Sequence, residues 1–284
     1  MEGLTVFGGF GFVGSQYVRD HYDAAVGNIV SVNGRNDYEV HSKDVLYFIS
    51  TVHNYHVFTD PYLDVSTNLT TLISVLESWR KRPDSQDGVF NFISSWFVYG
   101  TQNNPNGVSE AAVCDPRGFY GITKRCAEQL LSSYCYTYGL NYRILRLANV
   151  IGSGDTKVSA QKNALQHMVN QMVKNEDVGM YNGGNFYRDY IHVEDCSKAI
   201  NLCIALGKAN EIYNIGNGRT WLFKDIILYL ARELRTASRI TSVEPKDFHK
   251  VVQIPSFYMN TYKLQSLGHH SDYTGAKLFR SLLP

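Results

Sequence analysis

The most constraining feature of this sequence is a glycine-rich segment close to its N-terminus. A short apolar run, Leu4–Phe7, leads into Gly8-Gly9-Phe10-Gly11-Phe12-Val13-Gly14, and apolar residues then recur at helical spacing over 15–21. This order predicts a strand, a tight turn and a helix. Residues without a Cβ let backbone amides and the helix N-terminus approach a phosphate group, and the third glycine lets the helix pack close to the strand. The segment therefore predicts a dinucleotide site formed by Gly8, Gly11, Phe12, Val13 and Gly14.

Strand-like and helix-like segments alternate through the first half of the chain. The expected strands are 4–7, 28–33, 45–50, 89–94 and 142–150, and the expected helices are 15–21, 68–81 and 119–138. Such alternation predicts a parallel sheet covered on both faces, in a Rossmann-like doubly wound α/β fold. Ligands of such folds bind at the carboxyl edge of the strands, where the strand order reverses.

The regular alternation of expected strands and helices ends after Gly152. Helices are expected over 159–174, 193–206 and 220–235, a short strand over 211–215, and an irregular tail from residue 236. Only about ten residues separate the second strand from the next one, which leaves little room for a further strand and helix. We therefore expect an NAD(P)-binding domain over 1–152, shortened after its second strand. A smaller mixed α/β substrate-binding lobe over 153–284 is expected to return some segments to that domain.

Composition excludes several classes of function. The net charge is +1 and the basic residues are scattered, which predicts neither nucleic acid nor a membrane surface as partner. No apolar stretch reaches the roughly 20 residues of a membrane span, and the first strand begins too close to Met1 for a signal peptide. The five cysteines form no C-x-x-C pair, so neither a metal site nor a disulfide framework is expected. These observations predict a cytoplasmic protein.

The end of the second expected strand bears on the choice of cofactor. An acidic residue at this point would hold the ribose 2′-hydroxyl of NAD. The chain has Asn33 here, followed by Arg35, which could pair with a 2′-phosphate. A solvated arginine with Asp37 as its partner is the alternative interpretation. The cofactor is therefore expected to be NAD(P), with a slight preference for NADP.

Three residues form a candidate catalytic group. Tyr120 and Lys124 lie four residues apart, on one face of the expected helix over 119–138. A neighbouring ammonium would stabilise phenolate, so that the tyrosine could exchange a proton with a substrate hydroxyl while hydride moves to or from a nicotinamide. Lysine could also hold the cofactor ribose. Ser95 follows the strand 89–94, where its hydroxyl could bind the reacting oxygen.

With these residues in view, the chain resembles an extended short-chain dehydrogenase/reductase of the NAD-dependent sugar-nucleotide epimerase/dehydratase family. The resemblance spans almost the whole length. Beyond the glycine turn it rests on Ser95 four residues before Tyr99 and on the pair Tyr120 and Lys124. It also rests on three later segments, 146–152, 187–195 and 213–216.

The resemblance assigns further residues to the site. Asn149 and Arg188 would contact the diphosphate of a nucleotide sugar, beside Ser95 and Trp96. Ser50, Thr51 and Val150 would line the cofactor site together with Tyr120 and Lys124. Asn68 is interpreted as structural, and Asp189 and Asp195 as a buried ion pair and a helix N-cap. Pairing through two helices, common in this family, implies a possible homodimer.

Departures from the family pattern narrow the activity. Dehydratases of the family carry Asp-Glu directly after the catalytic threonine, whereas this chain has Trp96 and Phe97, which cannot transfer a proton. The favoured function is therefore an NAD(P)-dependent nucleotide-sugar epimerase, acting through a keto sugar at C4. The alternative is an NADPH-dependent nucleotide-sugar 4-ketoreductase. A non-catalytic NAD(P)-binding protein ranks third.

Overall fold

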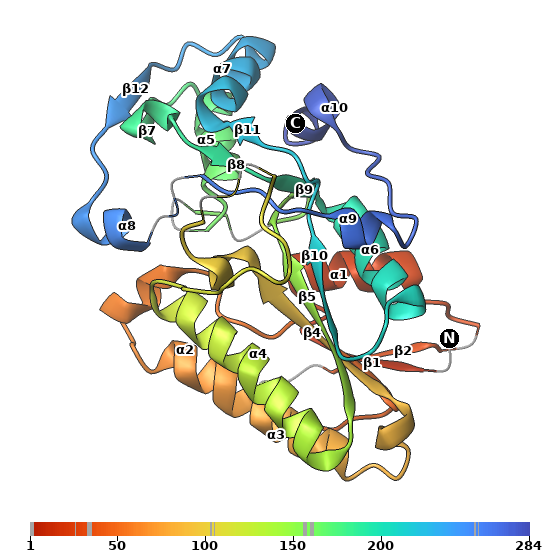
Figure 1. The fold of residues 1–284 in the computed structure, drawn as a ribbon. Helices are drawn as coiled ribbons and strands as arrows, with labels where there is room; N and C mark the ends of the chain where they lie inside the picture. Colours follow the sequence, from red (N-terminus) through yellow and green to blue (C-terminus); the bar gives the residue numbers. More distant parts are fainter. Residues whose placement is uncertain are drawn as a thin grey trace.

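The protein is built around one parallel sheet (Figure 1). The structure, a computed structural model, describes residues 3–25, 27–32, 36–102, 104, 106–155, 158–159, 162–252, 254 and 256–284. The sheet has six strands in the order β10-β5-β4-β3-β1-β2, all of which pair in parallel. Its strands are β1 Leu4–Phe7, β2 Ile29–Val32, β3 Asp44–Tyr47, β4 Val89–Ser95, β5 Asn141–Leu147 and β10 Glu211–Ile215. The predicted Rossmann-like α/β fold is thus confirmed.

Two layers of helices cover the sheet. The main helices are α1 Phe12–His21, α2 Leu63–Val65, α3 Thr71–Arg80, α4 Phe119–Tyr138 and α6 Val193–Leu206. Apolar side chains of α3 and α4 pack on one face of the sheet, for example Trp79 and Leu131. Those of α1 and α6 pack on the other face, for example Tyr17 and Ile200. Each layer is buried because the apolar residues of its helices recur on the face that meets the sheet.

Smaller elements complete the main domain. Its short 3₁₀ helices are η1 Asn54–Phe58, η3 Ser85–Asp87 and η4 Trp96–Tyr99. A π-helical turn, η2 Ser66–Thr70, directly precedes α3. Because β2 pairs only with β1, it forms the edge of the sheet beside the start of α1. The order reverses between β1 and β3, so the glycine turn after β1 lies at the switch point.

A second core lies beyond the carboxyl edge of the sheet. It holds α5 Ala164–Val173, α7 Phe223–Leu234 and α10 Gly275–Arg280. The same half of the chain also forms the 3₁₀ turn η5 Asn182–Gly184, α8 Asp247–Val252 and α9 Tyr262–Gln265, and Leu264 of α9 packs in the core of the main domain. Three two-stranded sheets join these parts. They pair β6 Asn149–Ile151 with β9 Tyr190–His192, β7 Val178–Tyr181 with β12 Ile240–Val243, and β8 Tyr187–Arg188 with β11 Trp221–Leu222. The segments α6 and β10 return to the main domain (Figure 1).

The expected strand over 142–150 is confirmed as far as Leu147, but its end is wrong, because the chain leaves the main sheet there. The strand β5 stops at Leu147, and the amide of Ala148 donates to the carbonyl of Ile215 (2.8 Å). Residues 149–151 then pair with β9 instead. The tail from residue 236, expected to be irregular, contains β12 and three short helices. In both places, contacts with distant segments override the local pattern.

Candidate active site

The glycine turn after β1 has the shape that a phosphate group requires. Gly8 has φ +79°, a conformation that favours glycine, and a Cβ on Gly14 would lie 2.3 Å from the carbonyl oxygen of Gly8. The N-cap residue of α1, Gly11, makes no side-chain hydrogen bond, and the first turn holds no acidic residue. The amides of Phe12, Val13 and Gly14 are therefore left to a ligand at the helix N-terminus. This arrangement fits the pyrophosphate of a dinucleotide.

The structure describes only some of the other residues expected in the cofactor site. Asn33 and Arg35 lie outside the described residues. Ser50 follows β3 at the carboxyl edge of the sheet and is half-buried, and Val150 lies half-buried in β6. The hydroxyl of Thr51 is buried and bonded to Asn68 and Asp64, so it faces the protein interior.

Ser95 and Tyr120 meet at the carboxyl edge of the sheet. Ser95 ends β4 in an extended conformation, and its Oγ accepts a hydrogen bond from the amide of Phe97 (3.3 Å). Tyr120 lies in the first turn of α4, with its ring edge-on to that of Phe97. Burial raises the pKa of the Tyr120 phenol, and hydrogen bonds with the hydroxyls of Ser95 and Ser50 partly offset this rise. The structure thus brings together two predicted catalytic residues, and Ser50, predicted for the cofactor site, supplies a third hydroxyl.

Lys124 lies one turn further along α4 but points at the sheet. Its Nζ donates to the carbonyl of Ile93 (2.6 Å) and stands 4.1 Å from the centroid of the Phe92 ring. The side chain is only 2% exposed. Burial lowers its pKa to about 7, against the charge of Glu128. Lys124 is not among the groups that shift the Tyr120 pKa, so the expected ammonium–phenol pairing is not seen in this structure.

A buried ion pair braces α4 against β5. Arg146 donates to both carboxylate oxygens of Glu128 (2.8 and 2.7 Å), and Ser94 donates to one of them (2.6 Å). Both partners of the pair are at most 1% exposed. The brace lies directly behind Ser95 and Lys124. It therefore fixes the helix that carries Tyr120 relative to the strand that carries Ser95.

The expected substrate residues gather where the second core meets the sheet edge. Arg188 packs between aromatic rings, 5.3 Å from the centroid of Trp96 and 4.7 Å from that of Phe186. Burial lowers its pKa to about 10, so it remains cationic at neutral pH. The side chain of Asn149 donates to the carbonyl of Asp189 (3.0 Å), one residue from Arg188. A cation against the ring of Trp96, the residue after Ser95, can hold the phosphates of a ligand whose other end reaches Ser95.

Asp189 and Asp195 differ from the expectation. Asp189 accepts the backbone amides of Asn217, Gly218 and Met259, rather than forming an ion pair. Asp195 accepts the amides of Asp272 and Tyr273, while the N-cap of α6 is His192. Each carboxylate ties together segments that are far apart in sequence, which local spacing cannot indicate.

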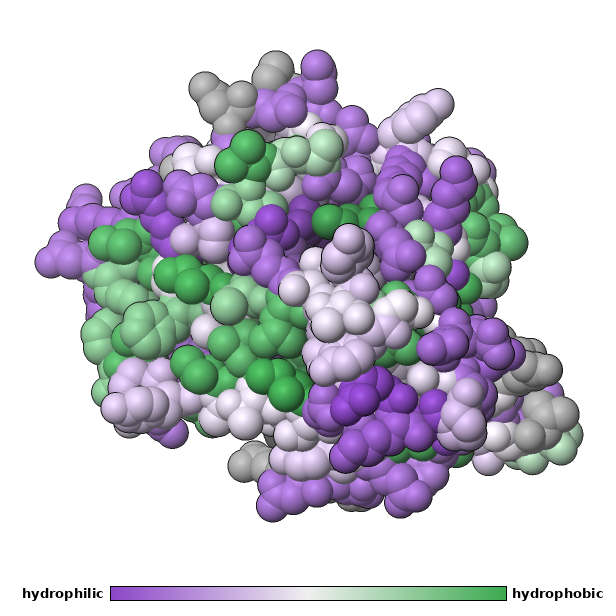
Figure 2. Space-filling view, turned by 60° about the horizontal axis from the view of Figure 1, so that its bottom comes forward, coloured by the Kyte–Doolittle hydropathy of each residue, from purple (hydrophilic) through white to green (hydrophobic). Residues whose placement is uncertain are grey.

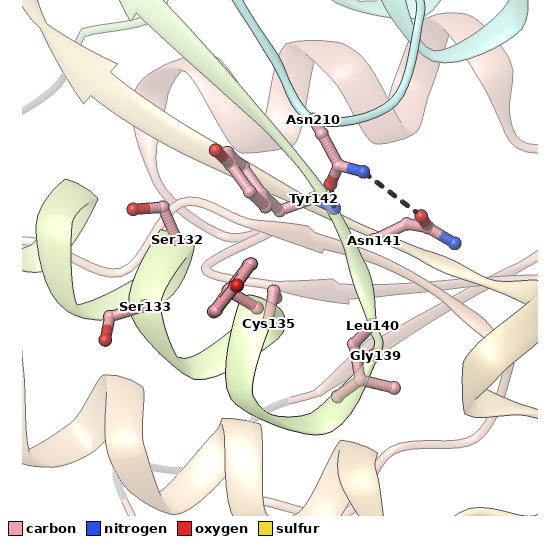
Figure 3. Close-up of a pocket in the computed structure, with 9 residues that line it drawn as sticks. Ser132, Ser133, Cys135, Gly139, Leu140, Asn141, Tyr142 and Asn210 are labelled. Atoms are coloured by element: carbon pink, nitrogen blue, oxygen red, sulfur yellow. Dashed lines mark hydrogen bonds between the residues drawn. The ribbon is translucent and has the colours of Figure 1, made fainter.

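Two surface pockets lie elsewhere. One, of about 680 Å³, is lined by the end of α4, the start of β5 and Asn210 (Figure 3). Because the strands are parallel, this is the edge of the sheet opposite to Ser95 and Tyr120. The other, of about 400 Å³, lies between the loop 152–155, α5 and residues 281–284. Neither contains a predicted catalytic residue.

Sequence reasoning missed one group of the site. Asp64, in α2, is fully buried behind Tyr120 and bonds to Thr51, which in turn bonds to Asn68. In sequence Asp64 stands in an exposed-looking run beside Asp60 and Pro61, with no charged partner at helical spacing. The one available signal was Asn68, which we interpreted as structural only.

The chain is similar to known proteins in sequence and in fold. The family model described as NAD dependent epimerase/dehydratase family matches residues 4–216. The protein of Methanocaldococcus jannaschii named "Putative UDP-glucose 4-epimerase" is 26% identical over 290 residues, covering 93% of this chain and 92% of that protein. The structure of UDP-glucose 4-epimerase from Thermotoga maritima with UDP-glucose has a TM-score of 0.84 at 23% identity, covering 99% of this chain and 96% of that one. The structure of RMD from Pseudomonas aeruginosa complexed with NADPH has a TM-score of 0.83 at 21% identity, covering 100% and 98%.

The match with the family model covers most of the chain, and it includes the glycine turn, Ser95, Tyr120, Lys124 and Arg188. No helix in the described ranges has the length and hydrophobicity needed to cross a bilayer. The chain belongs to the NAD dependent epimerase/dehydratase family, the extended short-chain dehydrogenase/reductase enzymes that act on nucleotide sugars.

Proposed function

We propose that the protein is an NAD(P)-dependent nucleotide-sugar epimerase that acts at C4. The observation that carries this proposal is the meeting of the Ser95 and Tyr120 hydroxyls at the strand edge, beside a glycine turn shaped for a pyrophosphate. The similarity to proteins named as 4-epimerases supports the choice of reaction. Trp96 and Phe97 after the catalytic serine argue against elimination of water, because neither side chain can exchange a proton.

The residues of this chain have separate roles in the proposed reaction. The turn and the N-terminus of α1 hold the pyrophosphate of the cofactor. When bound, the nicotinamide supplies hydride chemistry. Tyr120 takes the proton of the C4 hydroxyl and later returns one, while Ser95 holds the same oxygen. Arg188 binds the diphosphate. The keto sugar rotates between the two hydride transfers, so that its other face meets the nicotinamide. Lys124 binds the cofactor ribose, and to do so it gives up its hydrogen bond to the carbonyl of Ile93.

A 4-ketoreductase is the second candidate, and one observation favours it. Burial raises the pKa of Tyr120, so the phenol is protonated at neutral pH. A protonated tyrosine suits the reduction of a ketone, in which the oxygen receives a proton as the carbon receives hydride. We further propose NADP as the preferred cofactor, on the strength of Asn33 and Arg35, and a cytoplasmic site of action.

The test begins with the nucleotide released from the purified, denatured protein, identified by mass spectrometry. An epimerase regenerates its cofactor in each cycle, so stoichiometric NAD(P)⁺ supports epimerisation, whereas an empty site that binds NADPH reversibly supports reduction. Turnover is then measured on a panel of nucleoside-diphosphate hexoses and their 4-keto forms. Tyr120→Phe should abolish turnover, and Tyr136→Phe, which changes an exposed tyrosine of the same helix, should not. Full turnover by Tyr120→Phe would contradict both functions.

We also propose that the protein forms a homodimer through α3 and α4. Figure 2 shows hydrophobic side chains gathered on the face of the molecule that carries these helices. Val65 at the end of α2, Ile73 in α3, and Phe119 and Ile122 in α4 are each at least 40% exposed. Apolar residues on the outer faces of two adjacent helices are typical of an interface between helix pairs.

A further inference from the structure

The group behind Tyr120 begins with a buried carboxylate. Asp64 is fully buried, its Oδ1 accepts the hydroxyl of Thr51, and its Oδ2 has no hydrogen-bond partner among the described residues. A buried charge with one unsatisfied oxygen is costly. The catalytic roles proposed above do not use it. Its position beside the active site therefore requires an explanation.

Hydrogen bonds of fixed direction lead from Asp64 to the active site. A carboxylate can only accept, so Thr51 donates its one hydroxyl hydrogen to Asp64 and accepts from Nδ2 of Asn68 (2.9 Å). The amide of Thr51 donates to Oδ1 of Asn68 (2.9 Å), which fixes the same orientation of the Asn68 side chain. Ser50 then donates to Oδ1 of Asn68 (3.1 Å). This bond holds the Ser50 hydroxyl beside the Tyr120 phenol, with which Ser50 also forms a hydrogen bond.

Asn68 also reaches the helix that carries Tyr120. Its Nδ2 donates to Oγ1 of Thr123 (2.9 Å), and this hydroxyl donates to the carbonyls of Phe119 and Tyr120 (2.7 and 3.2 Å). Both Oδ1 and Nδ2 of Asn68 thus make two hydrogen bonds each. The network fixes both the backbone of the first turn of α4 and the hydroxyl that faces the phenol.

We propose that Asp64 is a positioning residue of the active site, which anchors Thr51 and Asn68 so that the Ser50 hydroxyl and the first turn of α4 are held in place around the Tyr120 phenol. Asp64 does not touch the substrate. It acts through Ser50, through the first turn of α4, and through its charge. This role rests on the proposed function only in naming Tyr120 as the acid and base of the reaction.

The charged groups around the phenol agree with this role. Among the groups that shift the Tyr120 pKa, Asp64 is the charged one, and it raises that pKa. His53, on the loop after β3, has its pKa lowered by burial and by His56, against the charge of Asp64, which raises it. Lys124 is held away by Ile93. The negative charge of Asp64 therefore acts on Tyr120 and disfavours phenolate.

The experiment titrates Tyr120 in the full-length protein labelled with [¹³Cζ]tyrosine, without substrate. The resonance is assigned by its loss in Tyr120→Phe. Asp64→Asn keeps the shape and an acceptor for Thr51 but removes the charge, and it should move the titration of Tyr120 to lower pH. Asp64→Ser is a second neutral variant, in case the first does not fold. Asp64→Glu restores the charge and should return the titration towards that of the wild type.

Asp195→Asn is the matched control, since it removes another fully buried carboxylate, which lies on α6 and accepts the backbone amides of Asp272 and Tyr273. It should leave Tyr120 unchanged. An identical titration of Tyr120 in the wild type and in the neutral variants, or an equal shift with Asp64→Glu, would overturn the proposal. Where turnover is measurable, the acid limb of the pH profile for alcohol oxidation should move to lower pH in Asp64→Asn, with KM for the sugar unchanged. A shifted titration in a protein without turnover would instead count against the proposed function alone.

Discussion

Replacing Lys124 by methionine should stabilise the protein while it removes a candidate catalytic group. The side chain is 2% exposed, and burial lowers its pKa from 10.5 to about 7. One pKa unit corresponds to about 1.4 kcal/mol, so burying this amine costs about 4 kcal/mol at pH 7. Methionine has a similar volume and no charge. It leaves the Ile93 carbonyl without its partner, at a cost of about 1–3 kcal/mol.

The net expectation is a gain of about 1–3 kcal/mol in the free energy of unfolding at pH 7. The gain should depend on pH. Between pH 7 and 10.5 the unfolded chain binds a proton at Lys124 that the folded chain does not, so the stability of the wild type rises with pH in this window. The advantage of Lys124→Met should therefore shrink by about 2 kcal/mol between pH 7 and pH 9.

The assay is urea unfolding of both proteins at pH 7, 8 and 9, followed by circular dichroism. Lys208→Met, which changes an exposed lysine, is the control and should show no such trend. A stability difference between Lys124→Met and the wild type that stays constant from pH 7 to 9 would refute the reasoning. It would mean that Lys124 remains charged in the folded protein.

Three further outcomes are expected. Gly14→Ala should abolish dinucleotide binding in calorimetry, because the new Cβ would lie 2.3 Å from the Gly8 carbonyl; wild-type affinity would contradict the assignment of the turn. Arg146→Met should cost about 3–5 kcal/mol in denaturant unfolding, because it leaves Glu128 buried without its main partner. Adding Glu128→Gln should recover part of that loss, and no recovery would speak against the ion pair as its cause. Ile122→Glu should give a monomer in light scattering if α4 forms the dimer interface; an unchanged dimer would place the interface elsewhere.

Local sequence determined the elements whose residues carry a complete pattern. The expected helices 119–138 and 193–206 and the strand 211–215 have the bounds of α4, α6 and β10. The spacing of their apolar residues suffices to define them. Glycines before a helix and a serine after a strand also indicated the carboxyl edge of the sheet, because parallel strands all end there.

Tertiary structure decided what depends on distant partners. The chain leaves the main sheet at Ala148 because β9 and Ile215 offer hydrogen bonds there. Lys124 points at Ile93 rather than at Tyr120, since the sheet presents a carbonyl within its reach. Asp64 joins the active site through Thr51, which lies 13 positions earlier, and through Asn68, which bonds to Thr123 of α4. Sequence spacing specifies which groups a helix or strand presents, whereas the direction of each hydrogen bond and the burial of each charge arise only when those elements pack together.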